Sequence, residues 1–336
     1  MKNLIPLFLG MIIICSAFVK ADAQTNRVAE TKPPPIYQPL EMESSPALQT
    51  LLVNAVGDTL NKYAAKKVTP DDVAATLIDL RDPKNLRAAN YRGDRQIYPA
   101  SVVKMFYLAA MHGWLEDGKI KSLTPELERG LKDMIVDSSN DATHFVVDIL
   151  TDTSGGGELA PPELKIYSDK RNAVNRYFAS LGYNDINVNQ KTYCEDLYGR
   201  ERQFWSAGKN RNRLTTNATA RLLAEIVLGK SVSPERSRLM MDLLKRDFSG
   251  TSKDADSQAH GFTALALNEL NLKDAKLWSK AGWTSKTRHD AAYVETPDGL
   301  KFVLVVFTEN FANEREIIPS IARLILKNFK QNSPMR

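Results

Sequence analysis

The alternation of apolar and polar residues predicts both helices and strands in the first third of the chain. Leucines and valines recur every three or four residues between Ala47 and Tyr63, which predicts an amphipathic helix. The segments VAATLIDL (73–80) and LRAANY (86–91) are rich in strand-forming residues and flank a turn, so they predict a strand pair. A further helix is predicted over 101–117.

Helical spacing dominates the middle of the chain. Thr124 is a predicted N-cap with Pro125 in the first turn, and a tight break at 138–140 separates that helix from the next. The Gly- and Pro-rich stretch 151–163 predicts a surface loop, and residues 184–213 show no clear period. The other helical segments predicted in this region are 142–150, 172–181, 214–228 and 233–248.

Strand patterns return in the last third. LWSKAGWTS (277–285), DAAYVET (290–296) and KFVLVVFT (301–308) predict three strands, and Pro297–Gly299 closes a hairpin between the last two. A final helix is predicted over 314–329.

Two strands therefore come early and three late, with helices between them. This order predicts an α+β fold: one antiparallel sheet of about five strands, built from both ends of the domain, with an inserted helical lobe. We expect one domain over 46–330, with a sheet lobe at 46–98 and 275–330 and a helical lobe at 99–274.

The first 23 residues predict a secretory signal peptide. Lys2 gives a positive start, an apolar run extends from Leu4 to Val19, and Ala21-Asp22-Ala23 is a small-x-small cleavage site. The run is shorter than the ~20 residues of a membrane span, although an uncleaved anchor is the alternative. We expect a secreted, periplasmic protein with a flexible, Pro-rich leader over 24–45.

Composition excludes several classes of function. The formal net charge is +5, and loss of the signal peptide, with its two lysines and one aspartate, leaves +4 without a basic stripe, so we expect no nucleic-acid partner. Only Cys194 remains after cleavage, which excludes an internal disulfide. The 4 histidines form no ligand-spaced cluster, so we expect neither a metal nor another cofactor.

The segment YPASVVKMFYLAAM (98–111) places Lys104 inside an apolar run. A lone buried ammonium is costly, so Lys104 either extends to water or serves a function in a dry site. Positions i and i+3 share a helix face, which brings Lys104 beside Ser101, and a partly desolvated lysine can take the proton of a serine nucleophile. The alternative is an N-cap serine with a snorkelling lysine. A second Ser-x-x-Lys, Ser206 to Lys209, lacks a helical context and is interpreted as chance.

Two further clusters carry candidate chemistry. Ser138 can pass a proton to a leaving nitrogen and Asn140 can hold a substrate amide, although plain capping of the following helix is the alternative. Lys280 can attract a substrate carboxylate from a strand in which Gly282 permits close approach of a ligand. The backbone N–H groups of the nucleophile and Trp283 can form an oxyanion hole. The alternative is an edge lysine with a bulge glycine.

The order Ser-x-x-Lys, Ser-x-Asn, Lys-x-Gly resembles that of the penicillin-recognising serine enzymes, and the chain resembles a class A β-lactamase-type serine hydrolase over nearly all of 46–330. The resemblance implies that Ser101 is the acylated nucleophile, Lys104 its proton acceptor and Ser138 the proton donor to the leaving nitrogen. It also implies that Asn140 and Lys280 bind the substrate, and it implies no metal.

The chain departs from the family pattern at several points. Ala281 stands where the family has Thr or Ser, whose hydroxyl helps to hold the substrate carboxylate. Ser139 replaces the usual Asp, and the interval from Ser101 to Ser138 is shorter than in typical class A enzymes.

The resemblance also implies a glutamate that activates water for deacylation. Counting back from Thr215-Thr216 favours Glu201, our preferred candidate, whereas counting forward from Leu181-Gly182 favours Glu195. Arg288 or His289 is a further candidate for holding the substrate carboxylate.

The leading hypothesis is therefore an exported serine hydrolase that opens β-lactams through an acyl-enzyme. A D-alanyl-D-alanine carboxypeptidase, of the penicillin-binding type, would use the same acylation machinery. A non-hydrolytic sensing domain would keep Ser101 but retain the acyl group. We expect a β-lactam or a cell-wall peptide as the small-molecule partner, and a monomer.

Overall fold

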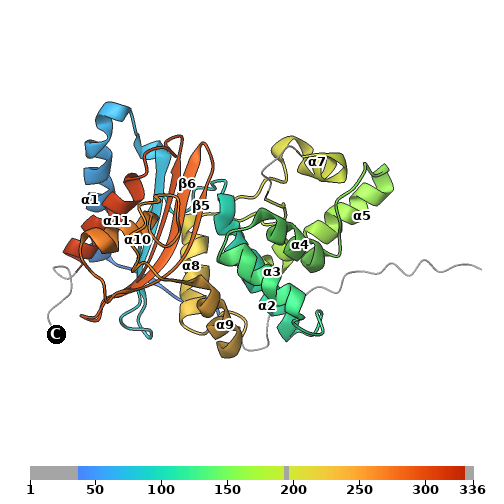
Figure 1. Ribbon diagram of the computed structural model, residues 1–336, viewed down its shortest axis with the longest axis horizontal. Coiled ribbons are helices and arrows are strands. Elements are labelled where there is room, and N and C mark those ends of the chain that lie inside the picture. Colours follow the sequence, from blue (N-terminus) through green and yellow to red (C-terminus); the bar gives the residue numbers. More distant parts are fainter. Residues whose placement is uncertain (1–36, 193–196, 330–336) are drawn as a thin grey trace, which may run out of the picture.

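The structure is a computed structural model that describes residues 37–192 and 197–329 (Figure 1). The predicted signal peptide, most of the Pro-rich leader, Cys194 and Glu195 lie outside these residues. Within them, no helix combines the length and the apolar character that crossing a membrane would require.

The centre of the fold is a seven-stranded sheet in the order β1-β3-β2-β7-β6-β5-β4. The predicted architecture, an antiparallel sheet from both chain ends with helices between, is confirmed. The two strands that sequence reasoning missed pair at the edges and have two residues each, which is too short to show an alternating pattern. Among the described residues, only β1 and β3 pair in parallel. The strands are β1 (Glu43–Ser44), β2 (Val73–Asp79), β3 (Arg87–Tyr91), β4 (Lys245–Arg246), β5 (Lys276–Trp283), β6 (Thr287–Glu295) and β7 (Lys301–Glu309).

One face of the sheet is covered by α1 (Pro46–Lys62), α10 (Phe262–Glu269) and α11 (Ile317–Asn328) (Figure 1). Apolar side chains of these helices form one buried cluster with strand residues such as Leu277 and Leu304. Burial of this apolar area is the main stabilising contribution on this side. Helix α10 lies in a stretch for which periodicity predicted no helix.

The opposite face carries the helices that hold the candidate site. α8 (Thr216–Val227) packs on β2, β6 and β7, and α9 (Pro234–Leu244) lies against it. α2 (Val103–Glu116) is central to this layer, because every residue from Val103 to Leu115 is buried. The other helices on this side are α3 (Pro125–Ile135), α4 (Asn140–Thr151), α5 (Pro161–Arg171), α6 (Ala173–Ser180) and α7 (Gly199–Trp205).

Two segments predicted as irregular are helical at the far end of this layer. The prolines that were predicted to lie in a loop begin α5 instead. A proline is tolerated in the first turn of a helix because the N–H that it lacks would have no partner within the helix. α7 lies within the irregular stretch 184–213 and packs against α5 (Figure 1). Short 3-10 turns complete the description: η1 (Ala64–Lys66), η2 (Pro70–Asp72), η3 (Ala100–Val102) and η4 (Ser206–Gly208).

Candidate active site

Ser101 lies in the 3-10 turn η3, directly before α2, rather than in the helix itself. The preceding residue, Ala100, has φ +46°, a left-handed conformation that costs a residue with a Cβ some strain. The turn packs against β5 and β6, and Ser101 is half-buried. Strained backbone next to a half-buried hydroxyl is typical of functional positions.

Lys104 is fully buried and does not extend to water. Its Nζ donates to the Ser138 carbonyl oxygen at 2.5 Å and to Asn140 Oδ1 at 2.8 Å, and lies 3.3 Å from Ser138 Oγ. These acceptors offset part of the cost of removing the ammonium from water. The lysine one turn after Ser101 therefore connects the turn η3 to the break between α3 and α4.

Lys280 approaches the same hydroxyl from β5. Its Nζ, also fully buried, donates to Ser138 Oγ at 2.9 Å, to Gln258 Oε1 at 2.6 Å and to the Ala281 carbonyl at 2.8 Å. Burial, with the nearby Lys104 ammonium as a second cause, holds the pKa of Lys280 well below its usual value. One serine hydroxyl thus lies between two buried amines.

The side chains of Ser138 and Asn140 are not the caps of the following helix. Ser139 is the N-cap of α4 and accepts from the Ala142 N–H at 3.1 Å, which leaves its two neighbours for other contacts. Asn140 Oδ1 also accepts from Thr192 Oγ1 at 2.9 Å. Ser138 has φ +57°, and this turn directs its hydroxyl toward the lysines. The capping alternative for Ser138 and Asn140 is therefore wrong.

Position 282 requires a glycine because the backbone of another segment of the protein passes close to it. A Cβ built at this position would lie 2.6 Å from the Ser101 nitrogen and 2.9 Å from the Pro99 carbonyl oxygen. The close neighbour is the protein's own turn η3, and the approach of a ligand to Gly282 stays a prediction. Ala281 is buried in the cluster on the other face of the sheet, whereas Trp283 is 51% exposed at the end of β5.

A comparison with models of protein families identifies the family of the chain. The model described as the Beta-lactamase enzyme family matches residues 55–329. The chain belongs to the Beta-lactamase enzyme family.

Several solved structures share the fold. The chain is similar to a beta-lactamase from Sphaerobacter thermophilus, with 21% identity, coverage of 84% of this chain and 99% of that chain, and a TM-score of 0.60. For PBP-A the corresponding values are 17%, 88%, 100% and 0.56. For a class A beta-lactamase from Bacteroides cellulosilyticus they are 17%, 84%, 98% and 0.56. At these identities the likeness concerns the fold. No curated protein matches the chain.

Neither additional candidate for carboxylate binding is open to a substrate in this member of the beta-lactamase family. His289 is fully buried: Nδ1 accepts from the Thr308 N–H and Nε2 donates to the Tyr98 carbonyl. The Arg288 guanidinium, 3% exposed, pairs with Asp256 at 2.6 Å. Both residues hold the fold together around the site, so the prediction for them is corrected.

Glu201 is buried in α7. Its carboxylate accepts from Arg171 at 2.8 Å and from Tyr167 at 2.7 Å, and it pairs with Lys191 at 3.2 Å. A carboxylate held by two cations and a phenol fixes α5 and α7 to each other. This arrangement argues against Glu201 as the base that activates water; the rival candidate, Glu195, lies outside the described residues.

Sequence reasoning missed Gln258, which contacts the site directly. Its Oε1 accepts from Lys280 Nζ and from the Ala281 N–H at 3.0 Å, while its Nε2 donates to the Val136 carbonyl at 3.0 Å. The residue lies in the polar segment between β4 and α10, which has no hydrophobic period. No signal in the sequence distinguished this amide from the other polar residues of the loop.

Proposed function

We propose that the protein is an exported serine hydrolase that forms an acyl-enzyme at Ser101, with β-lactam hydrolysis as its activity. The observation that carries the proposal is the pair of buried lysines, Lys104 and Lys280, on the single hydroxyl of Ser138. Burying two amines is expensive, and a protein retains such an arrangement where chemistry needs it.

The proposed reaction begins with Ser101. Its oxygen forms a bond to the amide carbonyl carbon while its proton passes to Lys104 Nζ, which must first give up one proton of its own to solvent. The tetrahedral intermediate collapses when the C–N bond breaks. Ser138 gives its proton to the leaving nitrogen and is reprotonated through the lysines, so that no proton is lost. Water then hydrolyses the ester and regenerates Ser101.

The substrate class follows from the charge of the site. The Lys280 ammonium attracts the carboxylate that accompanies a β-lactam amide, and the Asn140 amide offers a partner for the acyl side chain. A PBP-A variant of the same fold, 18% identical with a TM-score of 0.57, forms an acyl-enzyme with penicillin G. That likeness supports the proposal at the level of the fold.

A second candidate is a peptidase of the D-alanyl-D-alanine type. The position of Glu201 favours it, because a carboxylate committed to Arg171 and Lys191 removes the preferred candidate for the deacylating base that the resemblance implied; the other candidate, Glu195, lies outside the described residues. Acylation would then be retained while β-lactam turnover became slow. In both cases we propose a periplasmic location, which fractionation of cells that express the full chain would test.

The test combines turnover with intact mass. The chain without its signal peptide is incubated with a chromogenic cephalosporin, beside Ser101→Ala and a matched control, Ser206→Ala, in the second Ser-x-x-Lys sequence. Rapid colour change supports a β-lactamase, and a stable mass adduct supports the peptidase. Both signals should disappear in Ser101→Ala and persist in Ser206→Ala. Neither signal in the wild-type protein would contradict acylation altogether.

A further inference from the structure

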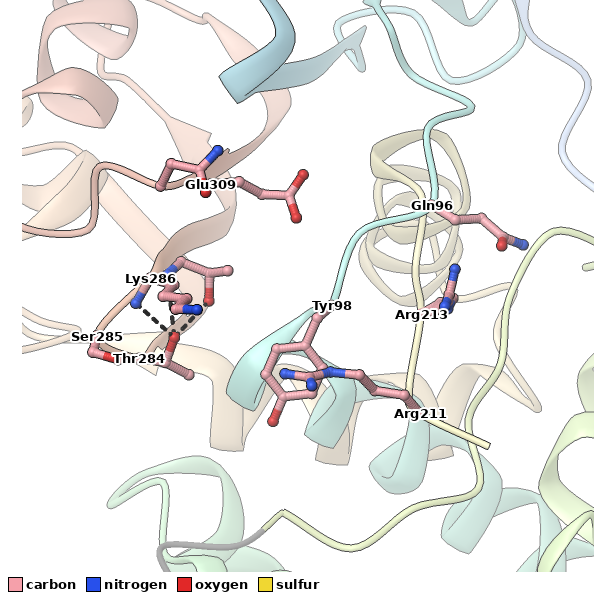
Figure 2. Close-up of a pocket in the computed structure, with 10 residues that line it drawn as sticks. Gln96, Tyr98, Arg211, Arg213, Thr284, Ser285, Lys286 and Glu309 are labelled. Carbon is pink, nitrogen blue, oxygen red and sulfur yellow. Dashed lines mark hydrogen bonds between the residues drawn. The ribbon is translucent and has the colours of Figure 1, made fainter. Parts of the chain in front are cut away.

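A cavity of about 620 Å³ lies beside the nucleophile turn (Figure 2). One wall is the segment that leads into η3, with Gln96 and Tyr98. The opposite wall is the β5–β6 turn, from Thr284 to Thr287, and the end of β7 with Glu309. Residues 211–213, just before α8, close a third side.

The cavity lining is positively charged. Arg211, Arg213 and Lys286 all line it, and their side chains are exposed. No ion pair of any of the three is found among residues 37–192 and 197–329. The Arg211 guanidinium stacks on the Tyr98 ring at 4.1 Å, as Figure 2 shows. The acidic residue of the lining, Glu309, is already paired with Arg95 at 2.8 Å.

The walls are held in place by hydrogen bonds that do not use the charged groups of these three side chains. His289 Nε2 donates to the Tyr98 carbonyl at 2.9 Å, which ties the first wall to β6. In the β5–β6 turn, Thr284 Oγ1 accepts from the N–H groups of Lys286 and Thr287, both at 3.1 Å. The cations therefore surround a formed cavity, and stacking limits the freedom of Arg211.

Strand β5 fixes which part of a substrate would reach the cavity. In the proposed reaction Lys280 lies at the leaving-group side, and in the strand it precedes Gly282, which packs on the Ser101 backbone. Thr284 follows on the other side, and each strand residue advances about 3.3 Å. The leaving nitrogen and the cavity thus lie on opposite sides of the nucleophile. A group that reaches the cavity belongs to the acyl-donor half of the substrate.

We propose that this cavity binds a carboxylate carried by the acyl-donor half of the substrate. The proposal rests on acylation at Ser101 for its kinetic consequence, but not for binding itself. Guanidinium groups pair with carboxylates in a bidentate manner, and three cations on one cavity raise the local concentration of anions. The preferred substrate is then an acidic acyl donor rather than a neutral one.

The kinetic test compares benzylpenicillin with its α-carboxy derivative, which adds one carboxylate to the acyl side chain. We expect the wild-type protein to be acylated about fivefold faster by the carboxy derivative at low salt, a size typical of exposed charge pairs, and added salt to reduce this preference. The cavity variant carries the three substitutions Arg211→Gln, Arg213→Gln and Lys286→Gln. It should lose the preference for the carboxy derivative without a change in its rate of acylation by benzylpenicillin. The charge-matched control, at the other end of the sheet, carries Lys84→Gln, Lys273→Gln and Lys301→Gln.

A binding test separates this proposal from the proposed function. Glutarate is titrated calorimetrically into the wild-type protein, the cavity variant and the charge-matched control. Saturable binding to the wild type and the control, lost in the cavity variant, supports the cavity even where neither penicillin acylates Ser101. Absent binding, or equal binding by all three proteins, overturns the proposal, as does an unchanged substrate preference in an active cavity variant.

Discussion

Gly282 and Ser101 are in contact through their backbones, so that a methyl group on Gly282 would lie 2.6 Å from the Ser101 nitrogen. The nearest obstacles are backbone atoms, which cannot rotate away as a flexible side chain can. The shape of the turn that carries Ser101 therefore depends on a residue that follows it by most of the length of the domain.

We predict that Gly282→Ala disables acylation while the protein still folds. A displacement of about 1 Å at a reacting group can cost roughly 100-fold in rate, and overpacking costs about 1–3 kcal/mol of unfolding free energy. Acylation kinetics and denaturant unfolding measure the two effects. The control is Gly57→Ala in α1, where a Cβ meets nothing within 4 Å and helix propensity should add about 0.5–1 kcal/mol. A Gly282→Ala protein with wild-type acylation would contradict the tight contact.

The second prediction concerns the contribution of the buried ion pair between Glu201 and Arg171 to stability. Glu201→Gln leaves the Arg171 guanidinium, which is fully buried, without its carboxylate, and we expect a loss of about 3–5 kcal/mol in unfolding free energy. The double variant Arg171→Met, Glu201→Leu should recover most of that stability. Chemical denaturation of the three proteins tests this.

The same variant tests the role first predicted for Glu201. If it were the base that activates water, Glu201→Gln would accumulate acyl-enzyme at nearly unchanged stability. We expect the reverse: a destabilised protein whose deacylation rate, measured well below its melting temperature, matches that of the wild type. Burst kinetics with mass detection distinguishes the two outcomes.

Long, regular elements were predictable because their burial is periodic. Strand β7 was expected over 301–308 and spans Lys301–Glu309, and α1 was expected one residue from its actual start. The N-cap at Thr124 was also correct, since its side chain accepts from the Leu127 N–H. In these places local preference and tertiary packing favour the same structure.

The errors fall where tertiary contacts override local pattern. Pro161 was interpreted as a loop residue, although it begins α5. The reason for Gly282 could not be derived from strand rules, because its neighbour Ser101 is distant in sequence. Gln258 reaches Lys280 from a loop without a period. Glu201 was aligned by counting residues, and counting cannot tell a base from a structural ion-pair partner.

Lys280 makes the unfolding free energy depend on pH, and replacing Lys280 should remove this dependence. Its folded-state pKa is well below 10.5, with burial as the first cause and Lys104 as the second. Between that lowered pKa and 10.5 the unfolded chain binds more protons, so the unfolding free energy rises with pH in this window. We predict that Lys280→Met removes the rise, gains about 1 kcal/mol at neutral pH and loses acylation. Unfolding free energies, measured with denaturant at a series of alkaline pH values, test this prediction. The same dependence of unfolding free energy on pH in the wild type and in Lys280→Met would contradict the lowered pKa.

The buried His112 gives a corresponding prediction on the acid side. It lies in α2, 2% exposed, and neither ring nitrogen has a hydrogen-bond partner among the described residues. Burial, followed by the positive charge of Arg236, lowers its pKa from 6.5 to about 4. The folded protein therefore keeps the ring neutral while the unfolded chain takes up a proton, and stability is lost as the pH falls from 6.5 to about 4.

At 1.36 kcal/mol per pH unit, that loss amounts to about 3 kcal/mol for this one side chain. We predict that His112→Leu removes it, because the ring contributes no hydrogen bond that leucine would have to replace. His289, whose pKa is also lowered to about 4 by burial, should preserve a similar acid sensitivity in the variant. Unfolding free energies at pH 7 and near pH 4 measure the difference. Equal losses in the wild type and His112→Leu would mean that His112 takes up its proton without unfolding.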